Sequence, residues 1–167
     1  PQLLGGVCKQ WREICLSMSS LWTSLRVYNR MDRGIDSLVD ALRCWLSRAG
    51  NCPIDLEIDG ALTAQCDILD VLGQFAFQLR SLDVSTPLPE TLIQGHIPHL
   101  QRLVLDILPR HKNAETASAA LHDAPRLREV DLSIQNVSFP WTQLTHLALR
   151  LGSLPRCLEI LQCTPRL

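Results

Sequence analysis

Two histidines, His96 and His99, are the residues whose spacing comes closest to that of a metal site. A zinc site needs several nitrogen, sulfur or oxygen ligands around the ion. No cysteine or carboxylate is placed to complete such a set, so we expect a surface turn here. The chain also lacks the phosphate-binding glycine motifs, H-E-x-x-H and G-x-S-x-G. The sequence therefore favours a protein that is not an enzyme and uses no cofactor or metal. An enzyme without a familiar motif is the alternative.

Seven cysteines form the second group with reactive side chains. Their number is odd, their spacing is irregular, and no two of them form C-x-x-C. Most lie in apolar segments of helical pattern, where a reduced cysteine packs as a small hydrophobic residue. We therefore expect buried free thiols in a reducing compartment, with a disulfide or zinc framework as the alternative.

Charge and hydropathy argue against two classes of partner. The 16 basic and 17 acidic residues give a net charge of −1, which offers no attraction to nucleic acid or to an anionic membrane. The longest apolar stretches are far shorter than the roughly 20 residues that span a bilayer. No basic stretch followed by an apolar one opens the chain, so we expect no signal peptide. We predict a cytoplasmic and/or nuclear protein with no nucleic-acid or membrane partner.

Charged residues recur at fixed offsets from pairs of apolar residues. Asp83, for example, lies between Leu82 and Val84. If such segments are parallel strands, the charges stack on one face, with acidic residues clustered around the second to fifth strands and flanked by a row of arginines. Repeat proteins bind extended partners on such a face. The simplest interpretation is that they are solvated surface charges that compensate one another. Our hypothesis is that the aspartates at 59, 83, 106 and 131 favour a basic partner segment. The candidate partner-binding residues are Glu57, Asp59, Arg80, Asp83, Arg102, Asp106, Arg128 and Asp131.

The elements that would position these charges belong to an internal repeat. The pattern L-x-x-L-x-L begins at Leu79, Leu100, Leu127 and Leu144, with Val84 and Val130 each replacing a leucine, and looser copies begin at positions 22 and 53. A seventh copy would begin at position 167. Successive copies start 17 to 31 residues apart, around the roughly 20–29 residues of a leucine-rich repeat. The fourth and sixth positions alternate with mostly polar neighbours, as on a half-buried strand.

The residues between the repeats must return the chain to start the next parallel strand. Helical spacing of apolar residues predicts helices over residues 35–49, 63–79, 114–124 and 154–163. A proline precedes the leucine that opens the repeats at 100, 127 and 167, and proline ends a helix. We predict an α/β fold, a leucine-rich-repeat-like right-handed solenoid with parallel strands on one face and helices on the other. An ordinary α/β domain with leucine-rich strands is the alternative.

An amphipathic helix is predicted before the first repeat. Val7, Cys8, Trp11, Ile14 and Cys15 fall on one helical face, and the serine-rich residues 17–20 end the helix. Because a solenoid leaves its apolar end open, a helix of this kind is expected to cap the core. On that account Trp11 is buried.

This segment also resembles a known family. Residues 7–14, V-C-K-Q-W-R-E-I, followed by S-L-W at 20–22, resemble the carboxy-terminal half of an F-box. Residues 45–58, W-L-S-R-A-G-N-C-P-I-D-L-E-I, resemble the fungal F-box and leucine-rich-repeat proteins. The resemblance spans nearly the whole chain. It implies the substrate-recognition subunit of an SCF-type ubiquitin ligase, in which the F-box docks on a Skp-type adaptor and cullin scaffold and the repeats bind a protein substrate for degradation. The alternative is a stand-alone leucine-rich-repeat interaction module.

The resemblance divides the chain into two parts. Residues 1–22 correspond to the C-terminal half of an F-box-like helical segment, and residues 23–167 to an irregular leucine-rich-repeat domain truncated at its C-terminus. The residues that the resemblance assigns to adaptor docking and to the cap are Val7, Cys8, Trp11, Arg12, Ile14, Leu21 and Trp22.

Overall fold

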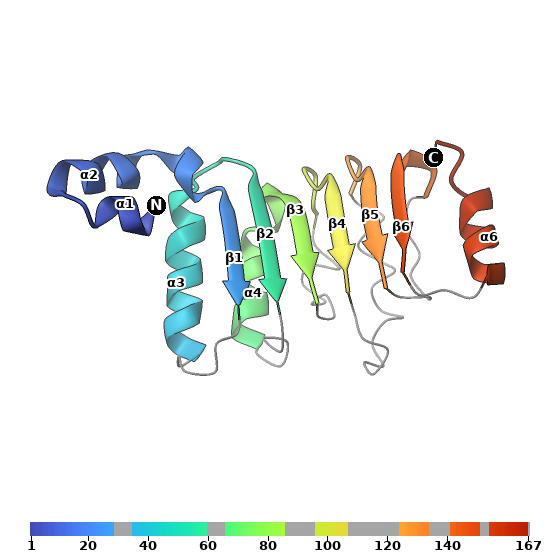
Figure 1. The fold of residues 1–167 in the computed structure, drawn as a ribbon, viewed down its shortest axis with the longest axis horizontal. Helices are drawn as coiled ribbons and strands as arrows, with labels where there is room; N and C mark the ends of the chain where they lie inside the picture. Colours follow the sequence, from blue (N-terminus) through green and yellow to red (C-terminus); the bar gives the residue numbers. More distant parts are fainter. Residues whose placement is uncertain are drawn as a thin grey trace.

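The computed structural model describes residues 1–28, 35–59, 66–85, 96–106, 124–133, 141–150 and 154–166, which form an α/β fold around a six-stranded sheet (Figure 1). All neighbouring strands are parallel, and their order in the sheet is their order in the chain. The predicted α/β class and parallel strands are confirmed, and the sheet is open. The strands are β1 (Ser24–Tyr28), β2 (Ile54–Asp59), β3 (Leu79–Val84), β4 (Arg102–Leu105), β5 (Glu129–Leu132) and β6 (His146–Leu149).

The register places the repeated apolar residues side by side in two columns. Because neighbouring strands lie about 4.8 Å apart, each residue of a column packs on the equivalent residues of the strands beside it. The members from β2 to β5 are at most 4% exposed, whereas Leu147 and Leu149 in the edge strand β6 are half-buried. The columns are Leu25, Leu56, Leu82, Leu103, Val130 and Leu147, and Val27, Ile58, Val84, Leu105, Leu132 and Leu149.

Helices α3 (Ile35–Arg48) and α4 (Cys66–Gln74) pack against these columns and complete the core. The predicted helix at 35–49 is confirmed, and Gly50 ends it with a φ of 59°, a left-handed conformation that glycine adopts without strain. The helix predicted over 63–79 is shorter, because residues 76–78 form a 3-10 turn and β3 begins at Leu79. Helix α6 (Leu154–Gln162) confirms the last helix. The helix predicted over 114–124 lies outside the described residues except at its final position.

The N-terminal residues form α1 (Gln2–Gly5), α2 (Lys9–Ser17) and the 3-10 turn η1 (Ser19–Trp22), and they lie beyond β1 in Figure 1. The expected helix is present, but the prediction that its apolar face is buried is wrong. Trp11 is 47% exposed, and Val7 and Ile14 are also exposed. From that face only Cys15 reaches the interior, and the main aromatic cap of the core is Trp22, which is 2% exposed.

Trp22 is held by three contacts at the end of the core. Its Nε1–H donates to the backbone oxygen of Cys15 over 2.8 Å. Its ring meets that of Trp45 edge-on with 4.7 Å between centroids, and the Arg48 guanidinium lies 4.6 Å above it. Trp45 Nε1–H in turn donates to the Trp22 backbone oxygen over 2.9 Å. The cap therefore joins the N-terminal segment to α3.

Two further expectations need correction. The six described cysteines are free thiols, but burial holds for Cys15 alone among them, because Cys8, Cys44 and Cys163 lie on outward faces of their segments and the remaining two are half-buried. In the repeat that begins at position 53, Ile54 takes the second position, where the pattern predicts a side chain that points outward. A register shift between Ile54 and Asp55 instead pairs Ile54 with Leu79, and its side chain is fully buried. The second repeat is therefore one residue shorter than the pattern predicts.

Candidate functional site

The side chains that alternate with the buried columns form the opposite face of the sheet, which we call the open sheet face. They make two rows, because strand residues two apart point the same way. The first row, near the N-terminal ends of the strands, consists of Ser24, Asp55, Ser81, Arg102, Glu129 and His146. The second row consists of Arg26, Glu57, Asp83, Val104, Asp131 and Ala148.

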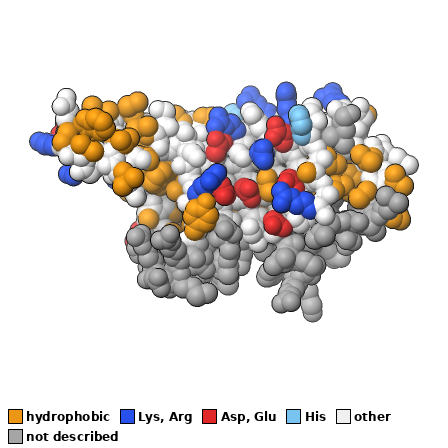
Figure 2. All heavy atoms as spheres, in the orientation of Figure 1, with side chains coloured by type: hydrophobic (Ala, Val, Ile, Leu, Met, Phe, Trp, Pro, Cys, Tyr) orange, Lys and Arg blue, Asp and Glu red, His pale blue; other side chains and the backbone are white. Residues whose placement is uncertain are grey.

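Arginine–carboxylate pairs cross between neighbouring strands of this face. Figure 2 shows the positive and negative side chains interleaved over the middle of the molecule. Each pair is at least partly exposed, so its contribution to stability is about 0–1 kcal/mol. The pairs are Arg26–Glu57 (Nε to Oε2, 2.6 Å), Arg80–Asp55 (Nε to Oδ1, 2.9 Å), Arg102–Glu129 (Nη1 to Oε2, 3.3 Å) and Arg150–Asp131 (Nε to Oδ1, 2.9 Å, and Nη2 to Oδ2, 2.6 Å).

Asp83 is left without an ion pair within the described part of the chain, although it lies in the middle of the second row. Burial raises the pKa of Asp83 above its ordinary value, and the negative charge of Glu57 beside it in the register raises that pKa further. Arg102 and Arg150 act in the opposite direction, and Asp131 adds to the increase. The Asp83 carboxylate is therefore under-compensated by cations of this face.

Arg150, just after β6, extends this electrostatic network. It donates two hydrogen bonds to Asp131, and these raise the pKa of the Arg150 guanidinium. The charges of Asp106 and Asp83 also favour its charged form. Asp106 is exposed and forms no ion pair within the described residues. Its backbone N–H donates to the Val84 oxygen over 3.1 Å, so the ladder between β3 and β4 continues to Asp106.

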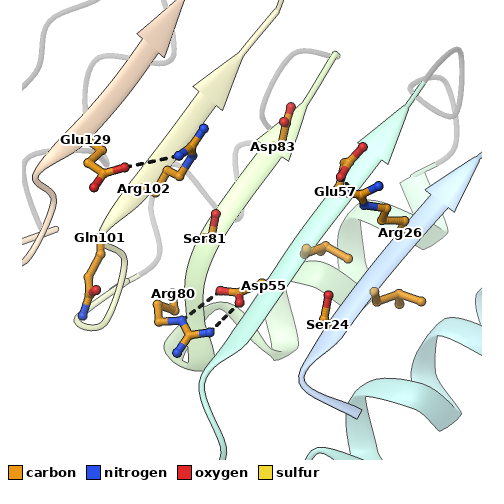
Figure 3. A pocket seen from close by; sticks show the side chains of 12 residues that line it. Ser24, Arg26, Asp55, Glu57, Arg80, Ser81, Asp83, Gln101, Arg102 and Glu129 are labelled. Atoms are coloured by element: carbon orange, nitrogen blue, oxygen red, sulfur yellow. Dashed lines mark hydrogen bonds and ion pairs between the residues drawn. The ribbon is translucent and has the colours of Figure 1, made fainter. Parts of the chain in front are cut away.

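Two adjoining hollows lie on the open sheet face. The first has a volume of about 500 Å³ and spans β1 to β5, and Figure 3 shows Arg26, Asp55 and Ser81 among the side chains that line it. The second has a volume of about 520 Å³ and lies over β4 to β6. Arg102 and Glu129 line both. Val104 lines the second hollow and is 7% exposed although it points to this face.

The structure brings most of the predicted partner-binding residues together. Glu57, Arg80, Asp83, Arg102 and Asp131 come from the four central strands and line the hollows. Arg128, just before β5, and Asp106, just after β4, are exposed beside them. Asp59 is the last residue of β2, and its side chain lies outside the described ones.

The predicted distribution of charge is wrong in one respect. We expected an acidic cluster flanked by a row of arginines, whereas the arginines are interleaved with the acids and paired across strands. The sequence-based set omits residues of this face that become neighbours of its members only when the strands are aligned. These are Arg26, Asp55, Glu129 and Arg150, together with Val104.

A second candidate surface lies on α1 and α2 and consists of exposed apolar side chains. We call it the N-terminal apolar surface, and Figure 2 shows hydrophobic atoms gathered over this end of the molecule. Arg12 links its two helices, because its Nε–H donates to the Gly5 oxygen over 3.0 Å. The members are Leu3, Leu4, Val7, Trp11, Ile14 and Met18, whereas Leu16 is exposed on the opposite side of α2.

The residues assigned to docking and cap by resemblance fall into two groups. Val7, Trp11 and Ile14 belong to the N-terminal apolar surface, and Cys8 and Arg12 are exposed beside them. Leu21 and Trp22 belong to the core: Trp22 is buried, and Leu21 is partly buried against it. Only the first group is accessible to a partner.

Within the described ranges, no group of three or more His, Cys, Asp or Glu side chains is arranged to hold a metal ion. No helix among the described elements is long and apolar enough to cross a membrane. Compared with known proteins, the chain matches no family profile, no curated sequence and no solved structure. We therefore infer the function from the two surfaces and from the resemblance of residues 7–22 and 45–58 to F-box and leucine-rich-repeat proteins.

Proposed function

We propose that this chain is a protein-recognition module, the substrate-recognition subunit of an SCF-type ubiquitin ligase, which binds a protein through the open sheet face. In this proposal the parallel strands are irregular leucine-rich repeats, and the N-terminal helices are an F-box-like segment that docks on a Skp-type adaptor and, through it, on the cullin scaffold. The chain itself carries out no catalytic step.

The observation that carries the proposal is a broad sheet face that no described helix covers and whose polar side chains are fixed by the register. A sheet in an ordinary α/β domain of this size is usually covered by helices on both faces when its strands are parallel. Here the described helices α3 and α4 pack on the buried columns, and the opposite face carries hollows of about 500 and 520 Å³. Repeat proteins use such a face to bind extended partners.

The N-terminal apolar surface supports adaptor docking. An exposed cluster of large apolar side chains is costly in water and marks a protein-interaction surface. Val7 is 64% exposed and Trp11 47% exposed, and both belong to the segment that resembles an F-box. Tryptophan is also among the residues that dominate binding energy at interfaces.

Co-purification with a Skp-type adaptor tests the ligase association. We expect the wild-type chain to co-purify with the adaptor, and the double variant Val7→Glu/Trp11→Glu to lose it while its melting temperature stays near that of wild type. Leu158→Glu is the matched control, because Leu158 is equally apolar and 53% exposed on α6, far from α2 in Figure 1.

These outcomes distinguish a ligase subunit from a stand-alone recognition module. Loss of adaptor in the Val7/Trp11 variant but not in the Leu158 variant supports the ligase subunit. If the wild-type chain does not bind the adaptor, ligase association is refuted. A stand-alone recognition module then accounts for the open sheet face.

A further inference from the structure

Two carboxylates of the open sheet face stand outside its cross-strand ion pairs, and they lie close together. The four cross-strand pairs leave Asp83 and Asp106 without an ion pair within the described residues. Arg128 is also unpaired there, but it precedes Asp131 by three residues, about 10 Å along an extended strand. The two unpaired carboxylates therefore lie in the second row, at Asp83, and just beyond it, at Asp106.

Val104 forms an apolar floor beside Asp83, Asp106 and Asp131. In the register Val104 lies between Asp83 and Asp131, and the two aspartates are therefore two strand spacings, about 10 Å, apart. Asp106 follows Val104 by two residues on the same strand path. A lysine or arginine side chain has the matching form, an aliphatic stem that covers apolar surface and a cationic end that stays with carboxylates.

Arg150 shows that Asp131, in the same row as Asp83, accepts a guanidinium. It binds Asp131 with two hydrogen bonds of 2.9 and 2.6 Å, and Asp106 and Asp83 also stabilise its charge. Arg150 comes from just after β6 and its side chain is 59% exposed, so a cation from solvent can compete with it for Asp131. Asp83 and Asp106 remain available to a cation that arrives from solvent.

We propose that the open sheet face binds an extended basic segment of its partner, with one arginine or lysine over Val104 between Asp83 and Asp106, and that Arg150 competes with this cation for Asp131. The inference rests on the proposed recognition function and names the chemistry of the partner. An extended segment places alternate side chains on one side, so basic residues at alternate positions would all face the sheet.

Fluorescence anisotropy with two labelled octapeptides tests the proposal. One alternates arginine with serine, and the other alternates glutamate with serine. We expect the arginine peptide to bind the wild-type chain and the glutamate peptide not to bind. The isosteric double variant Asp83→Asn/Asp106→Asn should weaken binding of the arginine peptide about 5- to 10-fold, as expected for the loss of two partly exposed charge contacts. Arg150→Ala should strengthen binding about 2- to 5-fold, because it frees Asp131.

Asp70→Asn is the matched control, since Asp70 is exposed on α4, the helix that packs behind the sheet. If Asp70→Asn weakens binding as much as the double variant, the peptide responds to net charge alone and the proposal is refuted. Equal binding of both peptides, or weaker binding by Arg150→Ala, also refutes it. Thermal unfolding of each variant confirms that it is folded. These variants leave α2 unchanged, so failure here is distinguishable from failure of adaptor co-purification.

Discussion

Two tryptophans of the N-terminal segment should differ sharply in their effect on stability. Trp22 is 2% exposed, donates a hydrogen bond to Cys15, and contacts Trp45 and Arg48. Truncation of a buried tryptophan to alanine costs about 3–5 kcal/mol, which includes the cavity it leaves. Trp11 is 47% exposed, so its truncation should cost less than about 1 kcal/mol.

Urea unfolding followed by circular dichroism measures both values. For a chain of this length about 4 kcal/mol corresponds to a decrease in melting temperature of about 8–16 °C, so thermal melts give an independent estimate. Trp22→Phe separates the hydrogen bond from the packing, because it keeps an aromatic ring and removes the Nε1–H donor, at a cost of about 1 kcal/mol for the bond. A Trp11→Ala loss as large as that of Trp22→Ala would refute the assignment of Trp22 as the cap and would mean that α2 packs on the core.

Three further predictions concern the backbone, the electrostatics and the ion pairs. Gly50→Ala should reduce the free energy of unfolding by about 1–2 kcal/mol in urea titrations, because Gly50 has a φ of 59°, whereas Gly73→Ala within α4 should not. The pKa of Asp83 is raised in the folded state. At pH values between the ordinary and the raised pKa, the folded chain therefore binds a proton that the unfolded chain does not bind. The stability that this proton contributes is lost as the pH rises through the raised pKa. Asp83→Asn should remove this pH dependence. If the variant and the wild-type chain show the same dependence of the unfolding free energy on pH, the raised pKa of Asp83 is contradicted. Arg80→Ala should lower stability by no more than about 1 kcal/mol and less at high salt, since the Arg80–Asp55 pair is partly exposed; a larger, salt-independent loss in urea titrations would show that the pair is structural.

The sheet could be predicted from the sequence because the pattern L-x-x-L-x-L indicates which strand residues are buried. A residue such as Leu103 is apolar, its neighbours on either side point away, and the same pattern recurs in each strand. The fourth and sixth positions therefore identified both buried columns, including Val130, which replaces a leucine. The exception was Ile54, where a one-residue shift changed the face of the side chain.

The environment of the N-terminal helix could not be predicted in the same way. Helical spacing shows that Trp11, Ile14 and Cys15 lie near one another on the helix surface, but not what covers them. In the structure Cys15 is buried, while Trp11 and Ile14 are exposed. Periodicity is the same for a helix that packs on its own core and for one that awaits a partner.

The ion pairs of the open sheet face depend on register and on side-chain length. The sequence places Arg80 and Asp55 25 residues apart, and only the alignment of β2 with β3 makes them neighbours. Arg150 reaches Asp131 from beyond the end of β6. The sequence therefore identified part of the charges that share the face. The structure added their partners and showed that, among the described residues, Asp83 and Asp106 form no ion pair.

Peptide selection followed by NMR mapping tests most directly whether the open sheet face binds protein segments. Peptides are selected from a random display library on the wild-type chain, and one is titrated into the ¹⁵N-labelled protein. We predict that the amide shifts concentrate on the second row and its flanks, at Asp83, Val104, Asp106 and Asp131, and that the selected peptides contain alternate basic residues. Shifts confined to α3 and α4, with no change on the strands, would contradict the account.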